Sequence, residues 1–179
     1  MISPSEFLEK WNADLFGIVK YDESTIASLN IPRDAKEFLI TAGLPKSAAP
    51  YLGFKSSKRG GATKINDPNF LKYIFIGNTG SGDSICIVEE SGDIVYLDHE
   101  NFYREVIINS SIPQFVESLL VYAEFVDKTN EENGENAFLD NNIPDGLIET
   151  LTNKLRDIDV KALGIEGFWY EELNNLRRK

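Results

Sequence analysis

The sequence predicts an α+β fold, in which a central sheet, mostly antiparallel or mixed, is flanked by helices. The middle of the chain carries short apolar runs rich in β-branched residues, at 71–76, 84–88 and 94–97. Residues 89–93 between the last two runs are too few for a parallel crossover and suit a hairpin loop. Segments with apolar residues at helical spacing precede and follow this region.

The sequence predicts two helices in the N-terminal third of the chain. Ser3 and Glu6 are spaced as a capping box, which indicates that a helix starts there. Residues 16–21 alternate only weakly and are compatible with a strand or a loop. A second helix is expected to begin near Pro32 and to end where Gly43 supplies a left-handed residue.

Residues 45–69 are expected to be mainly loop, and they include the basic stretch 55–64. Two glycines follow its basic residues, so binding of phosphate is conceivable, although an exposed loop is the simpler interpretation. Residues 106–108 are a candidate fourth strand.

The C-terminal part is predicted to be helical. One helix is expected to be capped by Ser110 or Ser111 and to carry an apolar stripe up to Val126, with 129–136 as a frayed end or linker. Further helices are expected from Pro144 and over 168–176. The chain is therefore interpreted as one domain over residues 1–179, with a helical segment at about 136–179 packed on it.

Composition narrows the class of protein. Apolar residues make up 42% of the chain, enough for a folded core, and no run approaches the roughly 18 apolar residues of a membrane helix. The start lacks the features of a signal peptide, and a single cysteine cannot form an internal disulfide, so we expect a cytoplasmic protein. The net charge of −11 argues against direct binding of nucleic acid.

The negative charge lies mostly in the second half of the chain. Residues 1–75 hold 10 Lys or Arg and 8 Asp or Glu, whereas residues 76–179 hold 8 and 21. A solvated acidic surface is the simplest interpretation, but such a surface also attracts a basic partner. The expected contacts are acidic residues of the hairpin and of the strand end. They are Glu89, Glu90, Asp93, Asp98 and Glu100.

The glycine-rich segment 77–83 resembles an anion-binding loop at first sight. It contains no lysine, and a strand follows where a Walker loop or a dinucleotide site needs a helix. We interpret it as a tight turn between two strands, with glycines at positive φ and Asp83 bonding nearby amides.

No catalytic, cofactor or metal site is predicted. His99 is the only histidine, and it is interpreted as an ordinary residue at a strand end. Cys86 has apolar neighbours and is expected to be buried. The oxygen-rich segment 140–145 does not match a calcium loop and suits a helix start.

Several segments in this order resemble the SUKH superfamily, specifically its fourth group of immunity proteins. The resemblance covers about residue 30 to the C-terminus. The segments are Phe38 to Pro45, Ile76 to Ile87, Asp93 to His99, Ile108 to Ser111 and Phe168 to Leu173. The resemblance implies that Gly77, Gly80, Gly82 and Asp83 form the glycine-rich turn of the family and that Trp169 is its structural tryptophan.

The resemblance also implies a function, which is neutralising a bacterial polymorphic toxin, often a nuclease or a deaminase. We therefore expect a non-enzymatic protein that binds a basic toxin domain and occludes it. One alternative is an interaction or scaffolding module unconnected with a toxin. Another is a small-molecule binder or enzyme that uses a pocket near residues 77–83.

Overall fold

The computed structural model describes residues 1–178 and begins with four short helices. They are α1 (Pro4–Lys10), α2 (Ala13–Phe16), α3 (Glu23–Ser28) and α4 (Arg33–Thr41). The capping box at α1 is confirmed, because the Ser3 hydroxyl accepts from the Glu6 amide and the Glu6 carboxylate accepts from the Ser3 amide. Gly43 follows α4 with φ +78°, as the sequence predicts.

The strands form two sheets, and all their paired strands are antiparallel. The small one pairs β1 (Ile18–Val19) with β2 (Leu44–Pro45). The large one has the order β3-β4-β6-β7-β8-β9, with β5 also paired to β6. Its strands are β3 (Ser47–Ala48), β4 (Leu52–Phe54), β5 (Thr63–Lys64), β6 (Tyr73–Thr79), β7 (Ser84–Val88), β8 (Ile94–Asp98) and β9 (Arg104–Asn109).

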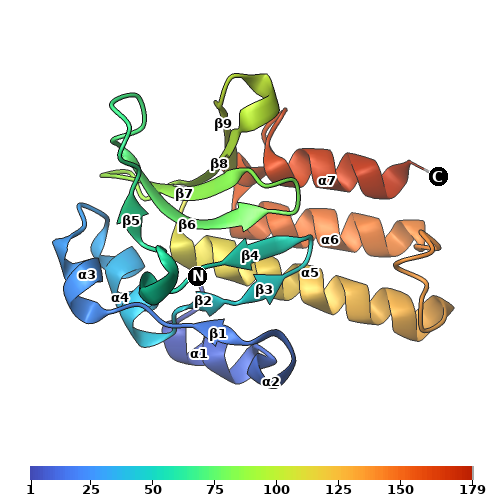
Figure 1. The fold of residues 1–179 in the computed structure, drawn as a ribbon. Coiled ribbons are helices and arrows are strands. Elements are labelled where there is room, and N and C mark those ends of the chain that lie inside the picture. Colours follow the sequence, from blue (N-terminus) through green and yellow to red (C-terminus); the bar gives the residue numbers. More distant parts are fainter. Residues whose placement is uncertain (179) are drawn as a thin grey trace.

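Three longer helices form the C-terminal part. They are α5 (Ile112–Asn133), α6 (Asp145–Ile158) and α7 (Phe168–Arg177). Short 3-10 turns are η1 (Ser57–Arg59), η2 (His99–Asn101) and η3 (Val160–Leu163). In Figure 1 the three helices, yellow to red, run side by side, while the N-terminal helices, in blue, lie at the lower left. The α+β class is confirmed.

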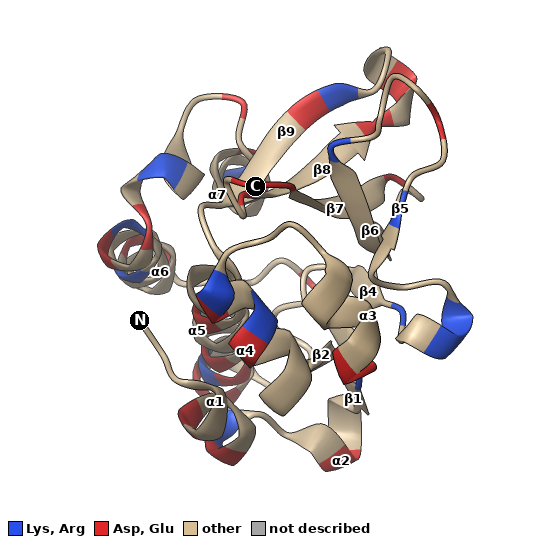
Figure 2. Cartoon of the chain, turned by 90° about the vertical axis from the view of Figure 1, so that its left-hand side faces the viewer, with Lys and Arg blue, Asp and Glu red and all other residues tan. Residues whose placement is uncertain are grey.

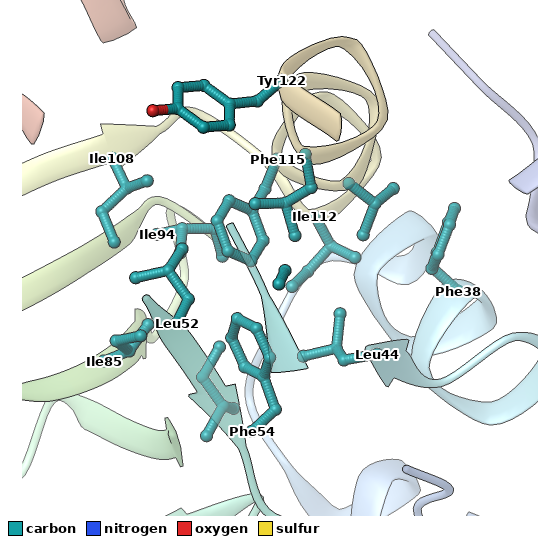
Figure 3. Packing of buried hydrophobic residues seen from close by; sticks show 14 of the residues in the cluster. Phe38, Leu44, Leu52, Phe54, Ile85, Ile94, Ile108, Ile112, Phe115 and Tyr122 are labelled. Carbon is teal, nitrogen blue, oxygen red and sulfur yellow. The ribbon is translucent and has the colours of Figure 1, made fainter. Parts of the chain in front are cut away.

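The main core lies between the sheet and the helices, and it contains residues from Ile2 to Leu176. Strand β7 shows why the sheet has two buried faces: Ile85 and Ile87 enter this core, whereas Cys86 between them points to the other face. There it joins a smaller cluster with Tyr73, Val95 and Leu97. Figure 3 shows the main core, where the rings of Phe54 and Phe115 meet edge to face with centroids 5.7 Å apart.

Several sequence-based boundaries were wrong. Helix α5 continues to Asn133 instead of fraying from residue 129, since Thr129 is buried and bonds the carbonyl of Phe125. The segment 45–69 is not simply loop, because β2 to β5 lie at least partly in it. Strands of two or three residues are too short to show an alternating pattern, so they form through pairing with other parts of the chain.

Candidate partner-binding site

The five acidic residues expected to contact a partner fall into two groups. Glu89, Glu90 and Asp93 lie at the turn between β7 and β8, whereas Asp98 ends β8 and Glu100 lies in η2. The register pairs Ile87 with Ile94 at one end of the hairpin and Ser84 with Leu97 at the other. The two groups therefore lie at opposite ends of the hairpin, roughly 10 Å or more apart.

Three of these carboxylates already have a cationic neighbour within the chain. Glu89 lies 2.8 Å from the Lys64 ammonium, Asp93 lies 3.2 Å from that of Lys161, and Asp98 lies 3.9 Å from the guanidinium of Arg104. These three residues are half-buried. Their negative charge is partly compensated before any partner arrives.

Glu90 and Glu100 are the more available members of the set. Both side chains are exposed, and neither forms an ion pair with another residue between 1 and 178. The Glu90 carboxylate accepts one long hydrogen bond, of 3.5 Å, from the side-chain amide of Asn30. These two carboxylates are the ones best placed to attract a cationic partner surface.

The glycine-rich segment is partly strand, which corrects the expected turn. Gly77 lies inside β6, and a Cβ there would come within 2.2 Å of the Gly53 carbonyl oxygen on β4. Gly77 therefore allows the two strands to approach closely. Of the three glycines at 77, 80 and 82, only Gly82 has the expected positive φ, at +94°. At Gly80 a Cβ would lie 2.9 Å from the Tyr51 side chain.

Asp83 is buried and reaches His99 rather than only nearby amides. Its Oδ1 accepts the backbone N–H of His99 at 3.0 Å and lies 2.5 Å from Nδ1 of the ring, while Thr79 donates to Oδ2. The pairing raises the pKa of His99, chiefly through the hydrogen bond to Asp83. Desolvation opposes ionisation of Asp83, but the bonds from His99 and Thr79 outweigh it and lower the pKa of that carboxyl.

The Asp83–His99 pair predicts a pH-dependent stability. The stability that His99 adds to the folded state is fully present below its ordinary pKa of 6.5. It is lost as the pH rises through the raised pKa of His99 in the folded protein. The stability that Asp83 adds is fully present above its ordinary pKa of 3.8. It is lost as the pH falls through the lowered pKa of Asp83 in the folded protein. We therefore expect His99→Gln to lower the melting temperature most between pH 3.8 and 6.5 and least in alkaline buffer.

Thermal unfolding followed by circular dichroism across this pH range measures the effect. The control is Glu9→Gln, an exposed carboxylate of α1 that is not among the charges acting on His99, and its difference from the wild type should show no matching pH profile. A melting-temperature difference for His99→Gln that stays constant from pH 5 to pH 9 would contradict the prediction.

A wide basic pocket has none of the five acidic residues in its lining. It has a volume of about 1020 Å³ and is lined by residues 18–22, 46, 51–59 and 78–80. The sequence identified the 55–64 stretch as basic, but the neighbouring segments come together only in the fold. Figure 2 shows the basic turn η1, in blue, at the margin of the molecule beside β4.

Metal-binding groups and the single cysteine were the other candidates for chemistry. No group of three or more His, Cys, Asp or Glu side chains between residues 1 and 178 is arranged to hold a metal ion. Cys86 is buried as expected, and burial raises the pKa of its thiol to about 12, where it is unreactive at neutral pH. Over the same residues, no helix is long and apolar enough to cross a membrane.

The chain is thus an α+β protein with acidic residues at both ends of its central hairpin and a basic pocket lined by separate segments. The model of the SUKH-4 immunity protein family matches residues 4–175, and the chain belongs to this family. Immunity proteins are generally non-enzymatic, and membership suggests immunity to a toxin, with a protein as partner. Searches of curated proteins and of solved structures found no significant match.

Proposed function

We propose that this protein binds a bacterial polymorphic toxin of the nuclease type in the cytoplasm and neutralises it by occlusion, without catalysis. The observation that carries the proposal is the match of the SUKH-4 immunity protein family over residues 4–175. The net charge of −11 supports a basic toxin domain as partner, because a nuclease needs cationic surface to hold its own polyanionic substrate.

The proposed contact with the toxin is the acidic surface made by Glu89, Glu90, Asp93, Asp98 and Glu100. Glu90 and Glu100 are exposed and carry no ion pair within residues 1–178, so they are the strongest candidates for steering the encounter. Exposed charges of this kind act mainly on the association rate, and added salt weakens their effect.

The proposal is tested by co-expressing the protein with the toxin encoded beside its gene. We expect the cells to survive and the purified pair to form a complex at low salt. Cell death together with no complex at low salt would refute the proposal and favour an interaction module unconnected with a toxin. A toxin that is neutralised but degrades no nucleic acid would contradict the nuclease type only.

Charge reversal tests the acidic surface separately. Glu90→Lys combined with Glu100→Lys should slow association about tenfold at low salt, because the steering charges are inverted. The matched control is Glu131→Lys with Glu132→Lys, two exposed residues at the end of α5 that change the net charge equally. Equal slowing by both variants, measured by stopped-flow fluorescence, would show that only the net charge matters.

A further inference from the structure

The basic pocket concentrates positive charge in a strongly acidic protein. Among the residues that line it are five cationic side chains and one acidic side chain, that of Asp22. The cations are Lys20, Lys46, Lys55, Lys58 and Arg59. They come from the end of β1, from the β2–β3 connection and from the segment around η1, so only the fold brings them to one concave surface.

None of these five cations forms an ion pair with a carboxylate of residues 1–178. Elsewhere the chain pairs many of its basic residues, as Lys64, Lys72 and Arg104 show. In the pocket, the Lys20 ammonium donates to the carbonyls at the end of α4, and that of Lys55 lies 5.1 Å from the centroid of the Phe75 ring. Lys46, Lys58 and Arg59 have neither an ion pair nor a hydrogen bond through their charged groups within residues 1–178, so they are the cations most available to an anionic ligand.

The rest of the lining is suited to an amphipathic ligand. The exposed ring of Tyr51 supplies the accessible apolar surface, because Leu52 and Phe54 beside it are only 2% and 5% exposed and pack into the main core. Tyr21 also lines the pocket, is buried, and has a hydroxyl without a hydrogen-bond partner. Burial raises the pKa of Tyr21, so this hydroxyl remains a donor at neutral pH, and a ligand oxygen that reached it would supply the missing acceptor.

The backbone around η1 is not arranged as a phosphate cradle. The amides of Arg59 and Gly61 both donate to the Ser56 carbonyl, and that of Gly60 donates to the Ser57 carbonyl. Phosphate sites in loops instead direct several free amides at the ligand. A long nucleic acid would also extend beyond the pocket onto the acidic remainder of the chain, where its phosphates are repelled.

From this combination we propose that the basic pocket binds an extended acidic segment of the protein partner, with carboxylates against the cations and an apolar side chain against the exposed ring of Tyr51. The inference rests on the proposed function, because the partner is the toxin. A volume of about 1020 Å³ is at or above the upper limit for small-molecule sites, which favours a chain segment. Two surfaces of opposite charge then define one orientation of the partner, since a reversed encounter brings like charges together.

The pocket can be tested on the purified protein without the toxin. The probe is a fluorescein-labelled decapeptide of eight glutamates and two central leucines, and binding is measured by fluorescence anisotropy at 50 mM NaCl. We expect saturable binding that weakens as salt is raised to 300 mM. Lys46→Glu combined with Lys58→Glu should weaken binding by about tenfold or more, because two unpaired cations become anions in the pocket.

The matched control is Lys10→Glu combined with Arg33→Glu, which makes the same change in net charge at exposed positions outside the pocket. Both variants are compared at 150 mM NaCl, where distant charges are screened, and we expect this control to bind the peptide within about twofold of the wild type. Melting temperatures of both variants show whether each is folded. Equal weakening by a folded control would assign the effect to net charge and overturn the proposal.

Two further results would overturn it. One is no saturable binding of the peptide. The other is at least tenfold tighter binding of pyrophosphate or of a ten-nucleotide uridine oligomer than of the peptide, which would make the pocket a phosphate or nucleic-acid site. Neither result touches the neutralisation assay, so failure of the pocket and failure of the proposed function are distinguishable.

Discussion

Replacing Trp169 by alanine is expected to lower the free energy of unfolding by about 4 kcal/mol, because it empties a large buried site. The indole is fully buried in α7, with its ring centroid 5.6 Å from that of Tyr122 on α5 and 4.9 Å from that of Phe168. Its Nε1–H donates to the side-chain oxygen of Asn109 on β9 at 3.0 Å. The side chain thus joins α7 to both α5 and the sheet.

Equilibrium unfolding in urea, followed by far-ultraviolet circular dichroism, measures this loss. Trp169→Phe should fall in between, because the aromatic ring stays while the buried Asn109 oxygen loses its donor. Tyr170→Ala, at the half-buried next position, is the control and should cost clearly less. A loss below about 1.5 kcal/mol for Trp169→Ala would contradict the structural role of the tryptophan.

Replacing Asp159 by alanine is expected to cost about 3 kcal/mol, because it leaves several donors without an acceptor. The carboxylate is buried at the start of η3. Its Oδ2 accepts from the Ser110 amide at 2.7 Å and from the Asn109 side chain at 3.3 Å. Its Oδ1 accepts from the Ser110 hydroxyl and from the amide of Lys161, both at 3.1 Å.

The matched control is Asp157→Ala, two residues earlier and exposed, which removes the same charge without removing these bonds. Urea unfolding of both variants at neutral pH separates the network from the charge. If the two variants lost equal stability, the bonds of Asp159 would not account for its effect. Asn109 lies at the centre of this network, since it also bonds Ser118 and Trp169. The Asp159 and Trp169 variants are therefore not expected to be additive.

Elements with a strong local pattern were predictable from the sequence. The hairpin of β7 and β8 follows from two apolar runs joined by five residues, and the structure differs only in extending β8 to Asp98. The start of α5 was predicted at Ser110 or Ser111, and the structure selects Ser111, whose hydroxyl accepts from the Gln114 amide. Trp169 was predicted to be structural and is fully buried. In each case the information lies within a few neighbouring residues.

The candidate contacts were harder to predict. The five acidic residues are close in sequence, but the hairpin separates them into two groups. Glu89 and Asp93 meet cations from distant segments, Lys64 and Lys161. The bond between Asp83 and His99 likewise joins residues 16 positions apart through the register of the sheet. No local spacing encodes such partners, because they depend on which strands pair and in which register.

The amino-acid sequence by itself determined the α+β class, the main helices, the central hairpin, the excess of negative charge and the resemblance to a family that the family model confirms. Only the tertiary structure decided which charges remain unpaired and where they gather. It brought five cations from separate segments into one pocket and neutralised part of the acidic surface within the chain. The physical reason is that secondary structure follows from near neighbours, whereas the electrostatic potential at a surface depends on charges that folding brings within a few ångströms.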